Sequence, residues 1–334
     1  MTGETGMQDG FGRKIDYLRI SVTDRCNFRC QYCMSEKMTF MPKSELLTLE
    51  EITLIAERFI GHGIRKIRLT GGEPLVRRDM GDVIQRLGRK VQSGELEELT
   101  MTTNGSLLEE YADHIANHNV RRINVSMDTL NPERFREITR GADIAQVLRG
   151  IDAAKNAGIR VKINMVGLRD FNETDLLPMA EYCAREGHDL TVIETMPLGD
   201  VGADRKLEHI PAEEFIAPLT REYDLEPVGY RSAGPARYHM VRPLGLRLGT
   251  ITPLSQNFCD GCNRLRLTTD GKIFMCLGHN AHVDLRSAVR NEGIEAVDRL
   301  LQKALKLKPL RHEFNAQLDG SADILERHMN VTGG

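Results

Sequence analysis

The sequence predicts an α/β fold with a parallel sheet, and three observations support this prediction. Strand-like and helix-like segments alternate along residues 17–195, the helical segments have recognisable starts and stops, and polar residues recur where the strands end. Parallel strands need long crossover connections, which the helices supply. Six β/α repeats are fewer than the eight of a full barrel, so an open partial barrel and a doubly wound sheet both fit the pattern.

The boundaries of the repeats follow from local signals. Thr48 with Glu51 and Ser106 with Glu109 have capping-box spacing ahead of apolar-periodic segments, and Gly158 is suited to close a later helix. The strands are expected at residues 17–22, 64–70, 99–103, 122–126, 160–166 and 190–195.

The regular alternation stops after Pro197. Short β-like pieces separated by Gly and Pro fill residues 228–274, and residues 283–307 have a mainly helical pattern. The chain is therefore expected to have three parts: a flexible tail over 1–12, a core over 13–198, and a smaller C-terminal α+β domain over 199–334.

Composition excludes several classes of function. The net charge is −3, so no bulk field favours binding to nucleic acid or a membrane surface, and no apolar run approaches the ~20 residues of a membrane span. Residues 1–12 lack a signal-peptide core. Seven cysteines in a chain without an export signal argue against a disulfide framework, which predicts a cytoplasmic protein. Cys183 lies on an apolar helical face and is expected to be a buried small hydrophobe.

The first cysteine cluster, Cys26, Cys30 and Cys33, has the spacing Cys-x3-Cys-x2-Cys and follows the first expected strand. Three soft thiolates on one loop suit a soft metal or an iron–sulfur cluster. Ferredoxin-type clusters take four cysteines, so three leave one iron with an open coordination position. The cluster therefore predicts a site where a non-protein ligand can bind and react.

Polar and special residues stand at the ends of the other expected strands. Because ligand sites of parallel α/β folds collect at the carboxyl ends of strands, these residues predict a single mouth. Gly-Gly-Glu-Pro alone would be interpreted as a strand-to-helix turn, and Asn-Gly marks turns generally. The strand ends are Gly71–Pro74, Thr102–Gly105, Ser126–Asp128, Lys162 with Asn164, and Glu194–Pro197.

The second cluster, Cys259, Cys262 and Cys276, is ambiguous by itself. It fits an incomplete zinc site about as well as an iron–sulfur site, and His279 or His282 could complete the zinc site. Between the cysteines stand Arg264 and Arg266, two residues apart in a strand-like run and hence on one face. Paired arginines suit an anionic substrate such as a phosphate, while a solvated strand face is the alternative.

These motifs together resemble a known superfamily. The first cysteine cluster, with Tyr32 before its last Cys and Gly71–Pro74 after it, is similar to the radical S-adenosylmethionine (SAM) enzymes. The fuller run 21–34, the second cluster and the terminal Gly333-Gly334 resemble the GTP 3',8-cyclases that begin molybdenum-cofactor biosynthesis. The resemblance extends from about Phe11 to the last residue. It implies an incomplete (β/α)6 TIM-type barrel with a smaller C-terminal α+β domain.

The resemblance also implies cofactors and site residues. Each cysteine triplet would hold a 4Fe–4S cluster, one chelated by SAM and the other touching the guanine of GTP. Arg264, Arg266, Gly333 and Gly334 are the implied catalytic residues. The implied SAM contacts are Tyr32, Gly72, Ser126 and Met196, and the implied GTP contacts are Arg19, Arg68, Thr102, Lys162, Arg264 and Arg266.

The implied chemistry is a radical cyclisation. One electron from the first cluster would cleave SAM to a deoxyadenosyl radical, which would take hydrogen from the ribose 3′ carbon so that this carbon bonds to guanine carbon 8. The implied partners are an electron donor and a downstream cyclic pyranopterin monophosphate synthase, with the protein a monomer or homodimer and with no nucleic acid or membrane partner.

One departure and two alternative functions accompany this hypothesis. Thr191 stands where the family often has Arg, so Arg231, Arg237 or Arg242 would have to replace that cation if one is required. The alternatives are a radical SAM peptide-modifying enzyme with an auxiliary cluster, and a non-catalytic zinc or interaction protein with two cysteine sites.

Overall fold

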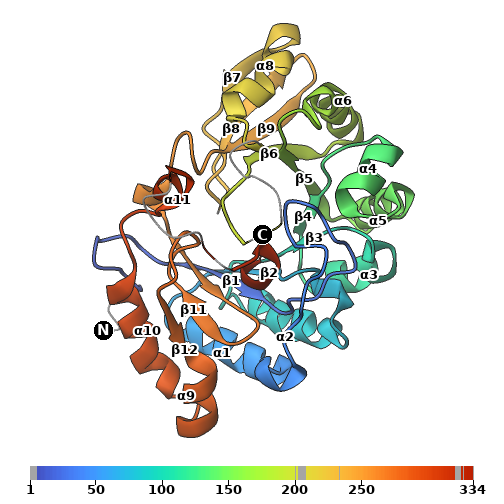
Figure 1. Cartoon of the computed structure of the whole chain (residues 1–334). Coiled ribbons are helices and arrows are strands. Elements are labelled where there is room, and N and C mark those ends of the chain that lie inside the picture. Colours follow the sequence, from blue (N-terminus) through green and yellow to red (C-terminus); the bar gives the residue numbers. More distant parts are fainter. Residues whose placement is uncertain are drawn as a thin grey trace.

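The computed structural model describes residues 6–199, 201, 208–232, 234–319, 325 and 327–333. Within them the strands form one twelve-stranded sheet in the order β12-β11-β10-β1-β2-β3-β4-β5-β6-β9-β8-β7. The sheet curves around a central opening, helices surround its outer face, and the C-terminus lies inside the curve (Figure 1). Among the described residues, no helix combines the length and apolarity needed to cross a membrane.

Six parallel strands form the centre of the sheet, as predicted. Each pairs with the next in chain order, and a helix follows each strand, which gives the partial barrel. The strands are β1 (Tyr17–Ser21), β2 (Lys66–Thr70), β3 (Glu98–Thr103), β4 (Arg122–Ser126), β5 (Arg160–Gly167) and β6 (Asp189–Glu194). The helices are α1 (Leu49–Gly61), α2 (Met80–Gln92), α3 (Leu108–Asn117), α4 (Pro132–Thr139), α5 (Ile144–Asn156) and α6 (Leu176–Glu186).

One of the two predicted capping boxes is present. Thr48 and Glu51 exchange side-chain and backbone hydrogen bonds at the start of α1. The Ser106–Glu109 prediction is wrong, because α3 begins at Leu108 without a side-chain cap. The Ser106 hydroxyl instead donates to Asn104 Oδ1 at 2.7 Å and accepts from Asn27 Nδ2 at 2.8 Å. Ser106 therefore holds the loop beside the first cysteine cluster.

The C-terminal part of the chain extends the same sheet at both edges. β9 (Leu246–Ile251) pairs parallel with β6, and β10 (Arg264–Leu267) pairs parallel with β1. The predicted division near residue 198 stays a prediction. The outer strands are antiparallel: β7 (Asp224–Pro227), β8 (Arg237–Arg242), β11 (Lys272–Phe274) and β12 (His282–Asp284). The remaining helices are α8 (Ala212–Glu222), α9 (Leu285–Glu292), α10 (Ala296–Leu307), α11 (Phe314–Asp319) and α12 (Met329–Thr332).

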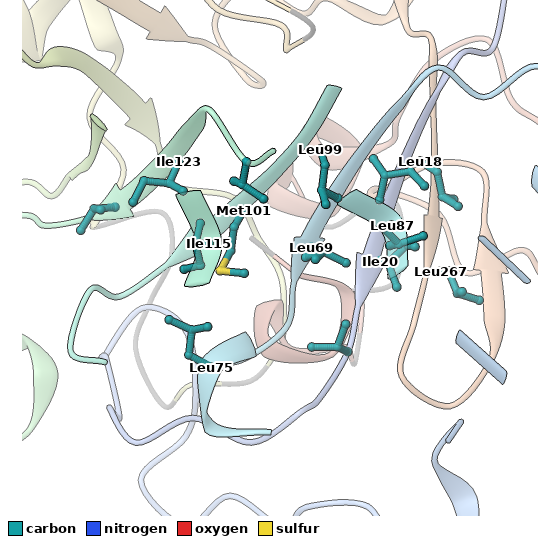
Figure 2. Packing of buried hydrophobic residues seen from close by; sticks show 14 of the residues in the cluster. Leu18, Ile20, Leu69, Leu75, Leu87, Leu99, Met101, Ile115, Ile123 and Leu267 are labelled. Atoms are coloured by element: carbon teal, nitrogen blue, oxygen red, sulfur yellow. The ribbon is translucent and has the colours of Figure 1, made fainter. Parts of the chain in front are cut away.

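Side chains along each strand alternate between the apolar core on the outer face of the sheet and the inner face. Leu18 and Ile20 of β1 and Leu69 of β2 pack on the outer face against helical residues such as Leu87 and Ile115 (Figure 2). Because successive side chains of a strand point to opposite faces, the intervening residues face the opening. On β1, β2 and β10 these include Tyr17, Arg19, Arg68, Arg264 and Arg266, which line one cavity.

Gly150 in α5 provides a test of how the helices position the strand ends. A Cβ at this position would clash with the carbonyl oxygen of Gly105, which follows β3. We expect Gly150→Ala to lower the free energy of unfolding by about 1–3 kcal/mol, because overpacking outweighs the gain in helix propensity. Gly61→Ala at the end of α1, where no atom lies within 4 Å of the added Cβ, is the matched control. Urea unfolding would measure both, and equal stabilities would contradict the packing argument.

Candidate active site

The first cysteine cluster lines a cavity at the carboxyl ends of the strands. Cys26, Cys30 and Cys33 all contribute to its wall, and none of them forms a disulfide. The Sγ of Cys26 accepts a hydrogen bond from the backbone N–H of Phe28 at 3.3 Å. Burial raises the pKa of Cys26 to about 11 and that of Cys30 well above its ordinary value. Thiols in this environment need a bound positive group to become thiolates, which suits a metal cluster.

The same cavity contains every residue predicted to contact SAM. Tyr32, Gly72, Ser126 and Met196 all line it. The Tyr32 hydroxyl donates to Asp128 Oδ2 at 2.9 Å, and Asp128 Oδ1 accepts from the backbone N–H of Val166 at 2.8 Å. Burial raises the pKa of Asp128 to about 6. Asp128 therefore connects the cysteine loop to β4 and β5, a positioning role that the sequence did not indicate.

The Gly71–Pro74 segment holds the cysteine loop from the other side. The backbone N–H of Gly72 donates to Thr23 O at 2.8 Å, and a Cβ on Gly72 would clash with the Arg25 carbonyl. The Glu73 carboxylate accepts from Thr103 Oγ1 at 2.8 Å and from Asn104 N at 2.6 Å. Burial raises the pKa of Glu73 to about 7. The segment is thus both the predicted turn and a wall of the cavity.

The second cysteine cluster lines a second cavity. Cys259, Cys262 and Cys276 lie on its wall, but neither His279 nor His282 does. Burial raises the pKa of Cys262, but the nearby charges of Arg264 and Lys308 bring it down to about 7. No group of three or more Cys, His, Asp or Glu side chains in the described parts of the chain is arranged to hold a single metal ion. An iron–sulfur cluster is supported here because three thiols line the same cavity and are buried or half-buried.

The two cavities adjoin. Asn164, Ile193, Met196 and Met329 line both of them, so a molecule in one cavity would lie next to a molecule in the other. Five of the six predicted GTP contacts, Arg19, Arg68, Lys162, Arg264 and Arg266, line the second cavity. Thr102 lines the first cavity instead, and its Oγ1 accepts from Arg68 Nη1 at 3.4 Å.

Cations stand in cross-strand register on the inner face. Arg19 of β1 is the register partner of Arg266 on β10 and of Arg68 on β2. In the described part of the chain, Arg68, Lys162, Arg264 and Arg266 form no ion pair with a carboxylate. Burial, followed by repulsion from Arg68 and Arg122, lowers the pKa of Lys162 to about 7. The cavity is therefore electrostatically prepared for a polyanion.

The C-terminal segment enters this cavity. The carbonyl oxygen of Gly333 accepts from Arg266 Nη1 at 3.0 Å and from Arg19 Nη2 at 3.4 Å. Asn330 Nδ2 donates to the Asp24 carbonyl at 2.7 Å, which anchors α12 to the loop before the first cysteine cluster. Gly334 lies outside the described residues.

The neighbour that the structure brings to Lys162 on the Thr191 side of the sheet is a tyrosine, Tyr238, rather than a cation. In the register of β6, β9 and β8, Thr191 faces Gly249, and Gly249 faces Tyr238. The Tyr238 hydroxyl lies 3.4 Å from Lys162 Nζ and donates to Ser232 Oγ at 3.0 Å. Arg231, Arg237 and Arg242 are exposed and line neither cavity, so none supplies the cation proposed for this position. Tyr238 was not indicated by the sequence, because only the β9 register brings it to Lys162.

Two family models match the chain. Residues 20–183 match the Radical SAM superfamily, and residues 188–314 match the model described as Molybdenum Cofactor Synthesis C. The GTP 3',8-cyclase of Brucella canis is 50% identical over 329 residues, which cover 98% of this chain and 96% of the relative. The GTP 3',8-cyclase of Agrobacterium fabrum is also 50% identical, over 98% of this chain and 94% of the relative.

Solved structures show a similar fold. Streptococcus suis SuiB bound to S-adenosylmethionine matches with a TM-score of 0.59 and 14% identity, covering 86% of this chain and 67% of SuiB. SuiB bound to its precursor peptide SuiA matches with a TM-score of 0.57 and 14% identity, covering 85% of this chain and 66% of SuiB. At this identity the likeness shows the fold alone, so it does not support the peptide-modifying alternative.

The seat of Gly333 can be tested by a paired substitution. Gly333 has φ +74°, and a Cβ there would clash with the side chain of Thr70. We expect Gly333→Ala to displace the C-terminal segment and to make it more sensitive to limited carboxypeptidase digestion. Thr70→Ala removes the two nearest side-chain atoms, so the double variant should recover part of the protection. Roughly 1–3 kcal/mol of backbone strain remains, because φ +74° with ψ 117° is a conformation that residues other than Gly rarely adopt. Wild-type protection in the Gly333→Ala variant would contradict the described seat.

Proposed function

This chain belongs to the radical SAM superfamily and, within it, to the GTP 3',8-cyclase family, and on this premise we propose that it cyclises GTP. The product would be (8S)-3',8-cyclo-7,8-dihydroguanosine 5'-triphosphate, which begins molybdenum-cofactor biosynthesis. One observation carries the proposal: two adjoining cavities are each lined by three cysteine thiols, and one of them is also lined by a row of cations. Among the described residues, Arg68, Lys162, Arg264 and Arg266 of this row form no ion pair with a carboxylate. This arrangement suits a radical source beside an anionic substrate.

The first cavity would hold the radical source. Cys26, Cys30 and Cys33 would bind a 4Fe–4S cluster, and Tyr32, Gly72, Ser126 and Met196 would contact SAM. When bound, the cluster and SAM together supply a deoxyadenosyl radical. The chain's own contribution is position: Asp128 holds Tyr32, and the loop 23–25 is fixed against Gly72 by backbone hydrogen bonds.

The second cavity would hold GTP. Arg19, Arg68, Lys162, Arg264 and Arg266 would bind the triphosphate, because charge-assisted hydrogen bonds from guanidinium groups match phosphate oxygens. Thr102 would act through Arg68, whose guanidinium it contacts. Cys259, Cys262 and Cys276 would hold the second 4Fe–4S cluster beside the guanine. Gly333 would complete the wall of the site, and Gly333 and Gly334, the latter outside the described residues, would have the catalytic role that the resemblance implies.

Exclusion of water is the remaining task of the chain. Met196, Ile193 and Met329 stand where the two cavities meet, so the path between them is largely apolar. The C-terminal segment, anchored through Asn330, lies inside the curve of the sheet (Figure 1), and Met329 and Gly333 contribute to the cavity wall. An enclosed apolar path protects a reactive intermediate from solvent.

The reaction also defines its partners by class. It needs a one-electron donor, and its product would be consumed by a cyclic pyranopterin monophosphate synthase. Free cysteines and iron–sulfur clusters require a reducing compartment, so we propose a cytoplasmic location. The protein would act as a monomer or homodimer.

Anaerobic incubation with GTP, SAM and a reductant tests the function directly. We expect a cyclised nucleotide by mass spectrometry and chromatography, together with deoxyadenosine. The protein should contain iron and sulfide and absorb near ~400 nm. A colourless zinc protein, or SAM cleavage that is unaffected by GTP and gives no new nucleotide, would overturn the proposal.

Substitutions should separate the two cavities. Cys26→Ala should abolish SAM cleavage, because one ligand of the first cluster is lost. Arg264→Ala combined with Arg266→Ala should retain uncoupled SAM cleavage but weaken GTP binding at least ~10–100-fold, since each charge-assisted hydrogen bond contributes roughly 1.5–3 kcal/mol. Arg78→Ala, which changes a side chain that is 92% exposed, is the control. Normal GTP affinity in the double variant would show the phosphate assignment to be wrong.

The lowered pKa of Lys162 predicts that GTP binding is coupled to the uptake of a proton. With a pKa of about 7, its side chain is mostly neutral at pH 8 in the free protein. A bound triphosphate favours the ammonium form, so GTP binding at pH 8 should take up as much as ~1 proton, and affinity should fall as pH rises from 6 to 8. Calorimetry in buffers of different protonation enthalpy measures this uptake. Lys162→Met should abolish it and exposed Lys155→Met should not, whereas buffer-independent wild-type heats would refute the linkage.

A further inference from the structure

Lys308 is a buried lysine that the proposed GTP and SAM contacts leave unexplained. It directly follows α10, and the residue is only 3% exposed. A buried ammonium is costly unless hydrogen bonds and a nearby negative group compensate for the water it loses. The surroundings of Lys308 must therefore supply both.

The contacts of Lys308 converge on the second cysteine cluster. Its Nζ donates to Met275 O at 2.7 Å and to Arg264 O at 3.0 Å, and it lies 3.4 Å from Cys262 Sγ. An ammonium has three N–H donors, so these three acceptors account for all of them. Two acceptors are neutral carbonyls, which leaves the sulfur of Cys262 as the one that can carry the compensating negative charge.

The position of the ammonium joins the two segments that carry the cysteines. Arg264 begins β10 two residues after Cys262, and Met275 lies directly before Cys276, next to β11. β10 and β11 pair antiparallel, with Arg266 opposite Phe274. Lys308 therefore spans the ends of both strands at the point where each meets the cavity wall.

The remaining charges around this site are mainly positive. The guanidinium groups of Arg264 and Arg266 line the same cavity, and Arg327 lies close enough to interact electrostatically with Cys276. A cluster of three ligating thiolates would balance these cations. The first cysteine cluster differs, because Glu73 lies near Cys26 and Asp128 near Cys30.

We propose that Lys308 is the positioning residue of the second cysteine cluster, donating an N–H···S hydrogen bond to the Cys262 ligand and fixing the two ligand-bearing strands. This inference rests on the proposed function, in which that cluster holds iron and sulfide. Hydrogen bonds to ligand sulfurs and nearby positive charge raise the reduction potential of an iron–sulfur cluster. Lys308 would thus raise the reduction potential of the iron–sulfur cluster held by the second cysteine cluster. It would leave the potential of the cluster held by the first unchanged.

The test compares Lys308→Met, which keeps the length of the side chain without its charge, with Lys308→Arg, which keeps the charge. Lys306→Met is the control, because it makes the same change on the exposed side of α10. The full-length proteins, which keep all six cysteines of the two cysteine clusters, are purified anaerobically and assayed for iron and sulfide. Redox titration followed by electron paramagnetic resonance then gives the midpoint potential of each cluster.

We expect Lys308→Met to move the potential of the second cluster to a more negative value, to lower its iron occupancy, and to leave the first cluster's potential as in wild type. Lys308→Arg should restore occupancy and most of the potential, and Lys306→Met should match wild type. If Lys308→Met does not fold, the test uses the midpoint potential of the second iron–sulfur cluster in Lys308→Arg. A potential far from the wild-type value, in a folded protein with full iron content, overturns the proposal.

An unchanged second potential in a folded, loaded Lys308→Met variant also overturns the proposal. So does an equal shift of both clusters, because a general structural effect would produce it. Wild-type protein without iron at the second cysteine cluster would instead refute the proposed function, so the two failures are distinguishable.

Discussion

A row of like charges in the inner face of the sheet is the constraint on which the rest of the site depends. Arg266, Arg19 and Arg68 stand side by side across β10, β1 and β2. Like charges directly opposite one another destabilise a sheet. The strands keep this register because their backbones pair and their outer faces join one apolar core. The fold thus stores a repulsion that a polyanion in the cavity would relieve.

Strand β1 connects this row to both cysteine clusters. The first cluster lies in the loop that follows β1. The second lies on the segments that precede β10 and follow β11, and β10 pairs with β1. The electrostatic settings of the two clusters differ at one thiol, because burial raises the pKa of Cys259 and Cys276 as it raises that of Cys26 and Cys30. Burial and nearby carboxylates disfavour thiolates at the first cluster, whereas Arg264 and Lys308 favour one at Cys262. One fold therefore offers two similar ligand sets that differ in the charges around a single sulfur, that of Cys262.

The sequence predicted the local parts of this architecture well. Alternation of apolar and polar residues located the six central strands, and the polar strand ends indicated one mouth because parallel strands end at the same edge. Features that depend on contacts between segments far apart in the chain could not be predicted from the sequence. Nothing in the sequence around Tyr238 shows that pairing with β9 brings it to Lys162. Likewise, nothing around Lys308 shows that the end of α10 brings it to Cys262. Ser106 failed as a cap because Asn27 and Asn104, one of them from a distant loop, compete for its hydroxyl.

The pairing of β9 with β6 and of β10 with β1 has a consequence for dissecting the protein. A six-stranded open sheet has two unpaired edges, each a row of free N–H and C=O groups that can recruit a strand from another molecule. Here the C-terminal part of the chain supplies both covering strands. A fragment ending after β6 would lack both covers and would be prone to self-association. The segment that carries the second cysteine cluster therefore also covers the β1 edge of the barrel strands.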